Sequence, residues 1–266
     1  MQVKVNTEKP FMVVLVALVA VAWLALWVWG QSPFGRFLSH EHTGGITLDD
    51  SPVQVAVLVA GWTLMTTAMM LPTSLPLIML FQRLIAQRRD WLRLVALLVM
   101  GYLAVWALFG FVAHLGDGFI HQAVDQIAWL ASNNWLIVSA TLLLAGIYQF
   151  TPLKYHCLDK CRSPLSFVMG HWQGGQRAAR QALMLGVHHG LFCIGCCWSL
   201  MLLMFAVGMG NIGWMLVLGG IMAVEKNMPW GRRISMPLGV FLIGLSIMVG
   251  WGSMTGVFEA PVHSHS

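Results

Sequence analysis

Residues 11–29 read FMVVLVALVAVAWLALWVW, an apolar run without a single charged side chain. A helix of roughly 20 apolar residues is long enough to cross about 30 Å of lipid hydrocarbon. The whole chain has the same character, because 58% of its 266 residues are hydrophobic and only 9% are charged. Soluble domains carry charge on about a quarter of their residues. The composition therefore predicts a membrane protein and excludes an ordinary soluble domain.

Similar apolar runs recur along the chain and predict an all-α, polytopic transmembrane bundle of about seven spans. We expect these transmembrane helices at residues 11–29, 53–81, 94–114, 135–150, 182–207, 212–228 and 237–254. No long linker, low-complexity tract or internal repeat divides them. Residues 1–266 are therefore expected to form a single integral membrane domain, with a substantial inner loop at residues 151–180 and an outer loop at residues 30–52.

Basic residues indicate how the chain is oriented. Lys and Arg near membrane ends collect on the cytoplasmic side. If the N-terminus is cytoplasmic, every Lys and Arg except Arg36 lies in a cytoplasmic segment, and an odd number of spans places the C-terminus outside. We expect a multi-pass protein of the bacterial cytoplasmic (inner) membrane. The net charge of +5 fits an inner face beside anionic lipid and calls for no nucleic acid.

The fifth predicted span carries groups that bind metals. Residues 188–197 read HHGLFCIGCC, and helical geometry places His189, Cys193 and Cys196 within an arc of about 60°. Imidazole and thiolate are ligands for copper(I) and zinc. We predict an intramembrane metal site built from His188, His189, Cys193, Cys196 and Cys197.

Two structural interpretations of that stretch remain open. Cysteine is also a small residue that is readily buried, and Gly186 with Gly190 has the spacing that lets a second helix approach closely. A histidine at depth in lipid usually faces a ligand, a polar path or a hydrogen-bond partner on another helix. Packing and an interhelical hydrogen bond are therefore the alternatives to metal binding.

The second predicted span offers sulfur of its own. Met65, Met69, Thr73 and Pro76 share one helical stripe, and Pro72 with Pro76 should free backbone carbonyls. Freed carbonyls inside a membrane must be covered by protein or water, so the stripe should face inward. Met69, or its neighbour Met70, is the candidate ligand here. The alternative is that these methionines only fill gaps in the core.

Three further residues outside the fifth span are candidates. Cys157 and Cys161 form a C-x-x-x-C pair after His156 in the inner loop, where reduced thiols suit metal transfer or redox exchange. Their alternative is an inert turn. Glu225 precedes Lys226 in an apolar segment, and it either pairs with a nearby base or balances the charge of a bound cation.

Four outer histidines form a separate set. They are expected outside the membrane, where they would collect metal weakly or, as the alternative, form an ordinary solvated surface. The four are His40, His42, His263 and His265.

Four motifs in order resemble a known family. They are A-M-M-x-P-x-x-x-P from Ala68 to Pro76, the segment Gln149 to Pro164 with Cys157 and Cys161, the run G-x-x-x-G-x-x-C-x-G-C-C-W ending at Trp198, and E-K-x-x-P from Glu225 to Pro229. Together they resemble a prokaryotic family of predicted metal-binding integral membrane proteins of unknown function, over about residues 53–251. The resemblance implies a polytopic plasma-membrane fold and a metal site that involves the five cysteines.

These observations together predict a membrane protein that binds a soft transition metal, copper(I) first and zinc second. The metal would be transported, stored or delivered to a partner, which we expect to be a metalloprotein or an oxidase subunit. The alternatives are a membrane thiol-disulfide oxidoreductase and a non-catalytic accessory subunit of a respiratory or copper oxidase. No catalytic triad, phosphate-binding glycine loop or carboxylate pair indicates an enzyme.

Overall fold

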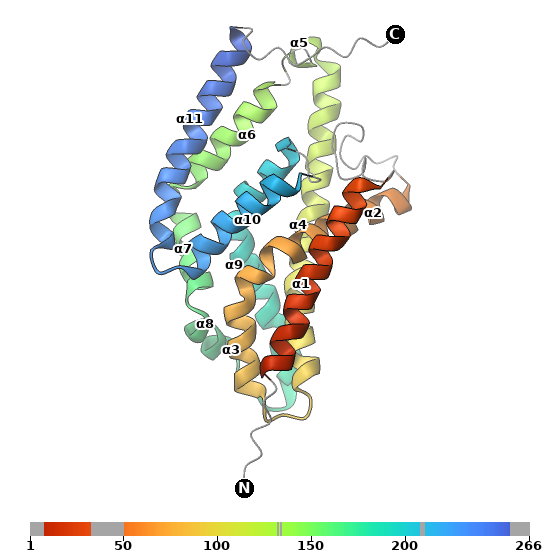
Figure 1. Ribbon diagram of the computed structural model, residues 1–266, viewed down its shortest axis with the longest axis vertical. Coiled ribbons are helices and arrows are strands. Elements are labelled where there is room, and N and C mark those ends of the chain that lie inside the picture. Colours follow the sequence, from red (N-terminus) through yellow and green to blue (C-terminus); the bar gives the residue numbers. More distant parts are fainter. Residues whose placement is uncertain (1–7, 33–50, 132, 134, 208–210, 256–266) are drawn as a thin grey trace.

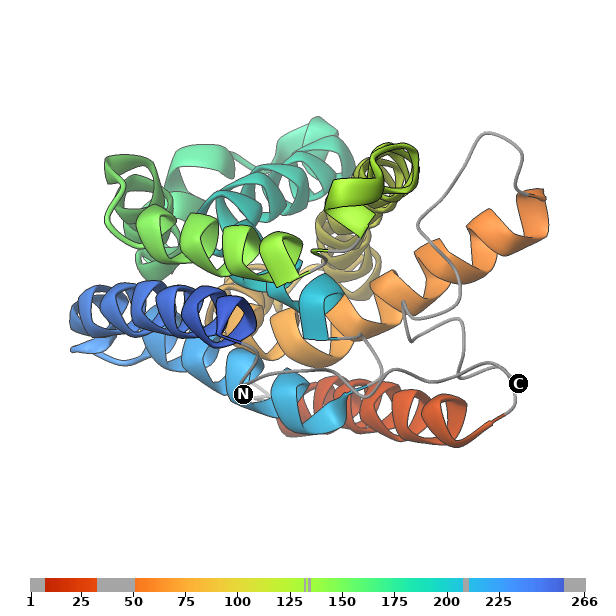
Figure 2. The same ribbon diagram turned by 90° about the horizontal axis from the view of Figure 1, so that it is seen from above.

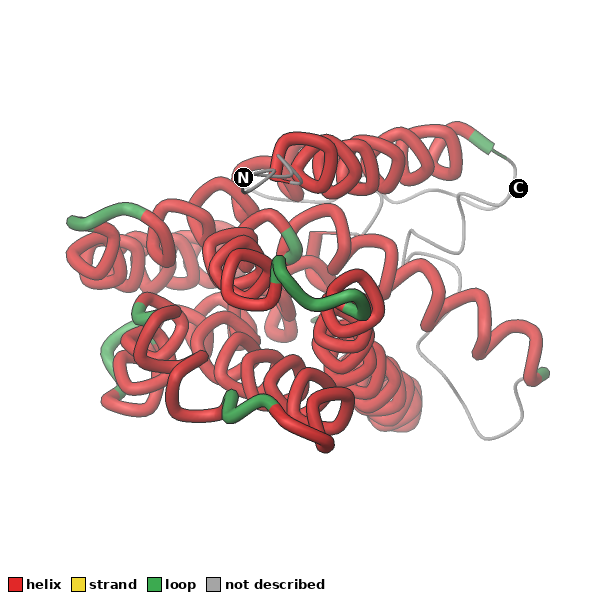
Figure 3. Tube along the Cα trace, turned by 90° about the horizontal axis from the view of Figure 1, so that it is seen from below, coloured by secondary structure: helices red, strands yellow, loops and turns green. Residues whose placement is uncertain are grey.

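The computed structural model describes residues 8–32, 51–131, 133, 135–207 and 211–255, and the regular elements in these ranges are all helices joined by short connections (Figures 1 and 3). This confirms the all-α fold class. The α-helices are α1 (Glu8–Gln31), α2 (Pro52–Met70), α3 (Leu75–Ile85), α4 (Trp91–Gln126), α5 (Ala128–Ala131), α6 (Trp135–Tyr148), α7 (Pro152–Arg162), α8 (Pro164–His171), α9 (Ala178–Val207), α10 (Ile212–Asn227) and α11 (Ser235–Met254). Short 3-10 turns are η2 (Pro72–Ser74), η3 (Gly175–Arg177) and η4 (Gly231–Ile234).

Helix α9 lies at the centre of the bundle and packs against α4, α6, α7 and α10. Its closest neighbour is α4, because Gly186 has no side chain. A Cβ atom at Gly186 would lie 2.0 Å from the Leu98 carbonyl oxygen of α4. The close helix approach predicted at this glycine is confirmed. Figure 2 shows α6 and α11 side by side on one flank and α1 with α2 on another.

The expected span at residues 53–81 is broken into two helices. Helix α2 begins at Pro52, where the Ser51 side chain accepts a hydrogen bond from the Gln54 N–H, and it ends at Met70. Pro72 has no N–H for the Ala68 carbonyl, and the Trp23 indole of α1 donates to that carbonyl instead, at 3.1 Å. The freed carbonyl is thus covered by protein, as the two prolines predicted.

Five described helical segments are long and apolar enough to cross a membrane, and the bent pair α6–α7 makes a sixth if it counts as one span. The two helices of that pair meet at 65°. Helix α10 has 16 residues, about 24 Å of helix, which is shorter than the hydrocarbon layer. The expected count of seven is therefore not confirmed.

The expected inner loop at residues 151–180 is largely helical, since it contains α7, α8, η3 and the first residues of α9. Helix α7 begins where the Thr151 hydroxyl accepts a hydrogen bond from the Lys154 N–H at 3.3 Å, with Pro152 in the first turn. Both are standard helix-start features. The helix places the C-x-x-x-C pair against α9, which a flexible loop would not do.

Candidate metal centre

A single turn of α9 carries Cys193, Cys196 and Cys197, and all three side chains are buried. Because each residue advances about 100°, Cys193 and Cys197 lie on one side of the helix while Cys196 is turned away from Cys197. The structure follows this geometry. Cys193 and Cys197 face α2, α4 and α10, whereas Cys196 faces α7.

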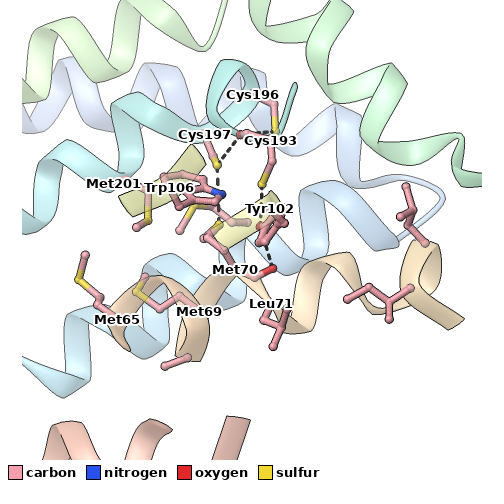
Figure 4. Close-up of a cluster of buried hydrophobic side chains, with 14 of the residues drawn as sticks. Met65, Met69, Met70, Leu71, Tyr102, Trp106, Cys193, Cys196, Cys197 and Met201 are labelled. Atoms are coloured by element: carbon pink, nitrogen blue, oxygen red, sulfur yellow. Dashed lines mark hydrogen bonds between the residues drawn. The ribbon is translucent and has the colours of Figure 1, made fainter. Parts of the chain in front are cut away.

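The first set of sulfur atoms, which we name the central sulfur group, comprises Met70, Cys193 and Cys197. The Cys197 Sγ lies 3.7 Å from the Met70 Sδ. The Lys226 Nζ lies 2.9 Å from the Cys193 Sγ and 3.8 Å from both the Cys197 Sγ and the Met70 Sδ. Figure 4 shows the three sulfur side chains converging from α2 and α9. Three soft donors therefore surround one buried cation.

Two hydroxyl groups hold the central sulfur group in place. The Tyr102 hydroxyl of α4 lies 3.1 Å from the Cys193 Sγ and donates to the Met70 carbonyl at 3.3 Å. The Thr73 hydroxyl donates to the same carbonyl at 2.8 Å and accepts from the Lys226 ammonium at 3.3 Å. The Met70 carbonyl is available because α2 ends there. The helix break therefore supplies part of the frame of the site.

The second set, which we name the α7 sulfur pair, comprises Cys161 and Cys196, whose Sγ atoms lie 3.9 Å apart. Cys157, one turn earlier on α7, also faces α9. A Cβ atom at Gly195 would lie 2.5 Å from its Sγ, so this glycine lets the two helices touch. Both α7 cysteines thus face α9.

One sulfur–sulfur separation in each set is short enough for a single ion to bridge: Met70 to Cys197 in the central sulfur group and Cys161 to Cys196 in the α7 sulfur pair. A thiolate–zinc bond is about 2.3 Å long, so two sulfur ligands of one ion of that size are at most about 4.6 Å apart. The separations of 3.7 Å and 3.9 Å are both shorter. Within the described ranges, however, no three His, Cys, Asp or Glu side chains gather around a single point. A site here therefore depends on methionine or on a pair of cysteines.

The comparisons with known proteins agree with this sulfur chemistry. A family described as PpoB2, copper chaperone, matches residues 59–249, which is most of the chain and includes both sulfur sets. The chain belongs to this family. Its function is accordingly copper-related delivery. No curated protein and no solved structure matches the chain.

The five ligands predicted in α9 do not meet at one point in the structure. The His189 Nε2 lies 3.0 Å from the Ser74 hydroxyl, and its ring stacks on Tyr102 with 5.5 Å between centroids. This contact is the interhelical hydrogen bond that sequence reasoning held as the alternative to a metal ligand. His189 adjoins the central sulfur group through Tyr102 without facing its sulfur atoms.

His188 lies on a different side of α9 from the cysteines that face α2. Its ring lies 5.0 Å from that of His171 on α8, between centroids, and its buried Nδ1 has no hydrogen-bond partner. His171 was not predicted as a site residue, since a lone histidine near a helix end gives no signal of its own.

Of the two candidate methionines, Met70 contacts the cysteines of α9 and Met69 contacts α10. The Met69 side chain lies 3.6–3.7 Å from a Cβ position at Gly219 of α10. Figure 4 shows Met69 well apart from the cysteines, while Met70 lies against them. The side chains of neighbouring helical residues point about 100° apart around the helix axis, so only one of the two methionines can contact Cys197.

Glu225 was predicted to pair with a nearby base or to balance the metal charge, and its carboxylate pairs with Lys154 of α7. The Lys154 Nζ lies 2.8 Å and 3.0 Å from its two oxygens, and the Ser235 hydroxyl donates to it at 2.7 Å. Lys154 also donates to the Gln149 side chain. Lys226, the adjacent residue, points instead toward the central sulfur group. The helical turn separates the two charges.

Sequence reasoning missed two contributors to the site, Tyr102 and Lys226. The E-K pair in an apolar helix was a signal, but only its acid was selected. Tyr102 gave no signal, because its role depends on α4 packing against α9. The outer candidates His40, His42, His263 and His265 lie outside the described residues.

Proposed function

We propose that the chain is an integral protein of the bacterial cytoplasmic membrane that binds copper(I) at its central sulfur group and delivers it to a partner metalloprotein. The observation that carries this proposal is the convergence of Met70, Cys193 and Cys197 on one buried cationic group. The three sulfur atoms are soft donors, and the Lys226 ammonium shows that a positive charge is accommodated among them. Membership of the copper chaperone family supports the same metal.

Membrane insertion is supported by the surface of the outer helices. On α1, the side chains of Val13 and Val14 are 66% and 63% exposed, and on α11 those of Val240 and Ile247 are 65% and 64% exposed. Such continuous apolar faces need lipid rather than water. Residues 1–266 would then form one membrane domain.

Orientation follows from the basic connections. Figure 1 places the α3–α4 connection and α8 toward one end of the bundle and the end of α11 toward the other. The α3–α4 connection carries Arg88 and Arg89, so its end would be cytoplasmic under the positive-inside rule. The N-terminus would share that side.

Copper(I) fits the donor set better than zinc. Thioether and thiolate sulfur are the ligands that copper(I) prefers, and copper(I) is satisfied by two or three of them. Structural zinc sites are closed by four ligands, and the described residues do not gather four. Cys161 is only partly buried, whereas Cys193 and Cys197 are buried. The α7 sulfur pair would therefore receive copper(I) first and pass it around α9 to the central group.

The test is copper(I) binding to the detergent-purified protein under anaerobic conditions, measured by competition with a chromophoric copper(I) chelator. Cys193→Ser combined with Cys197→Ser should abolish high-affinity binding at the central group, while Cys157→Ser should retain it. Met70→Leu should weaken binding at least tenfold. Met69→Leu is the matched control and should leave the affinity unchanged. Equal affinities for the two methionine variants would contradict the assignment.

A second candidate function is membrane thiol-disulfide exchange, and one observation favours it. Cys161 and Cys196 come from different helices and their Sγ atoms are 3.9 Å apart, so a small movement would allow a bond of about 2.05 Å. In this case the cysteines would change their alkylation pattern on reduction while the purified protein carried no metal.

A further inference from the structure

Lys226 lies in the bundle interior with its side chain directed at sulfur. It is 6% exposed, and its Nζ contacts the Cys193 Sγ at 2.9 Å, the Thr73 hydroxyl at 3.3 Å and two further sulfur atoms at 3.8 Å. A buried ammonium is costly unless an anion compensates it. The nearest acceptor is the Cys193 sulfur, which makes that sulfur the natural partner of the charge.

The adjacent acid does not serve as that anion. The Glu225 carboxylate is paired with the buried Lys154 at 2.8 Å. In the part of the chain that the structure describes, no carboxylate forms an ion pair with Lys226. The Lys154–Glu225 pair is neutral as a unit and adds no net charge beside the sulfur atoms. The charge of the central group is therefore set by its cysteines and Lys226.

The net charge of the loaded site follows from this inventory. Cysteine binds metals as thiolate, so Cys193 and Cys197 bring two negative charges, Met70 brings none and Lys226 brings one positive charge. The sum before metal is −1. A monovalent cation makes the buried group neutral, whereas a divalent cation leaves a charge of +1 in a medium of low dielectric constant.

We infer that Lys226 determines the charge selectivity of the central sulfur group, so that the site accepts a monovalent soft cation and rejects divalent ions such as zinc. This inference rests on the proposed copper(I) function and extends it from the choice of soft donors to the choice of ion charge. The Met70 thioether and the small number of donors give part of the preference for copper(I), but the two thiolates bind copper(I) and zinc alike. The positive charge of the Lys226 ammonium disfavours the divalent zinc ion relative to monovalent copper(I).

The test compares silver(I) with cadmium(II), which are both soft, closed-shell, redox-stable ions of similar size and differ in charge. Their affinities for the purified full-length protein are measured by competition, and thiolate absorption in the ultraviolet reports binding. The wild-type protein should prefer silver(I). Lys226→Met, which keeps side-chain length but removes the charge, should shift the affinity ratio toward cadmium(II) by about 1,000-fold, as expected for a unit charge about 4 Å away at an effective dielectric constant of about 20. Lys226→Arg should keep the wild-type ratio.

A second perturbation adds a charge and leaves the lysine in place. Thr73→Asp introduces an anion next to the ammonium and should shift the ratio in the same direction as Lys226→Met, while Thr73→Asn should not. Circular dichroism and the thermal midpoint identify any variant that is misfolded.

The outcomes separate the inference from the proposed function. If the wild-type protein binds silver(I) but neither Lys226→Met nor Thr73→Asp shifts the ratio by tenfold, the inference is overturned and the copper(I) site stands. If the wild-type protein binds neither ion at its cysteines, the proposed function itself fails.

Discussion

Replacing Glu225 by leucine should destabilise the protein strongly without removing the proposed copper site. The change leaves the Lys154 ammonium, which has no exposed surface, without the carboxylate that lies 2.8 Å away. Removing one partner of a buried ion pair costs about 3–5 kcal/mol, a large part of the 5–15 kcal/mol that holds a typical domain folded. The free energy of unfolding is measured by titrating the detergent-purified protein with SDS and following tryptophan fluorescence.

The matched control removes both charges. Lys154→Met combined with Glu225→Leu should recover most of the lost stability, since apolar residues of similar size can replace a buried pair at little cost. Copper(I) stoichiometry should stay unchanged in both variants, because Glu225 does not touch the central sulfur group. A cost below about 1 kcal/mol for the single change, or a double variant as unstable as the single one, would refute this reasoning. Loss of copper would restore the charge-balancing role expected from the sequence.

The remaining predictions concern the two faces of α9. Gly186→Ala should lower stability by about 1–3 kcal/mol, because a Cβ atom would lie 2.0 Å from the Leu98 carbonyl oxygen, which cannot move without its helix. Gly116→Ala, which meets nothing within 4 Å, should be neutral or slightly stabilising, and thermal midpoints that fall equally would contradict the close approach. Mild oxidation should link Cys161 to Cys196, as seen by peptide mapping after alkylation, and silver(I) added first should protect them. A linkage between Cys157 and Cys161 instead would contradict the geometry of α7 and α9.

Local regularities made much of the helical fold predictable. The apolar runs at residues 11–29, 94–114 and 182–207 lie within α1, α4 and α9, since length and hydrophobicity are properties of the segment itself. Two features depended on more than the apolar runs. The prolines of the second span ended α2, in line with the expected freed carbonyls, and the connection after Phe150 folded into a helix at 65° to α6.

The candidate site was predictable only as far as one helix determines it. The 100° rule placed Cys193 on the same side as His189, whereas the common face of the α7 cysteines appears only because residues 152–162 are helical. Which neighbour meets each face depends on tertiary packing. Met70 replaces Met69 because α2 is rotated to present it to Cys197, and Lys226 enters because α10 approaches α9 at that depth. No pattern within either segment contains that information.

The grouping of three cysteines on one turn of α9 has a consequence for how this protein can change. A rotation of that helix about its own axis would carry Cys193 and Cys197 away from their partners while it moved Cys196 relative to α7. Neither sulfur set can be adjusted alone by repacking α9. A substitution that shifts this turn therefore affects both sulfur sets at once. A change confined to one set has to occur in the helix that packs against that set.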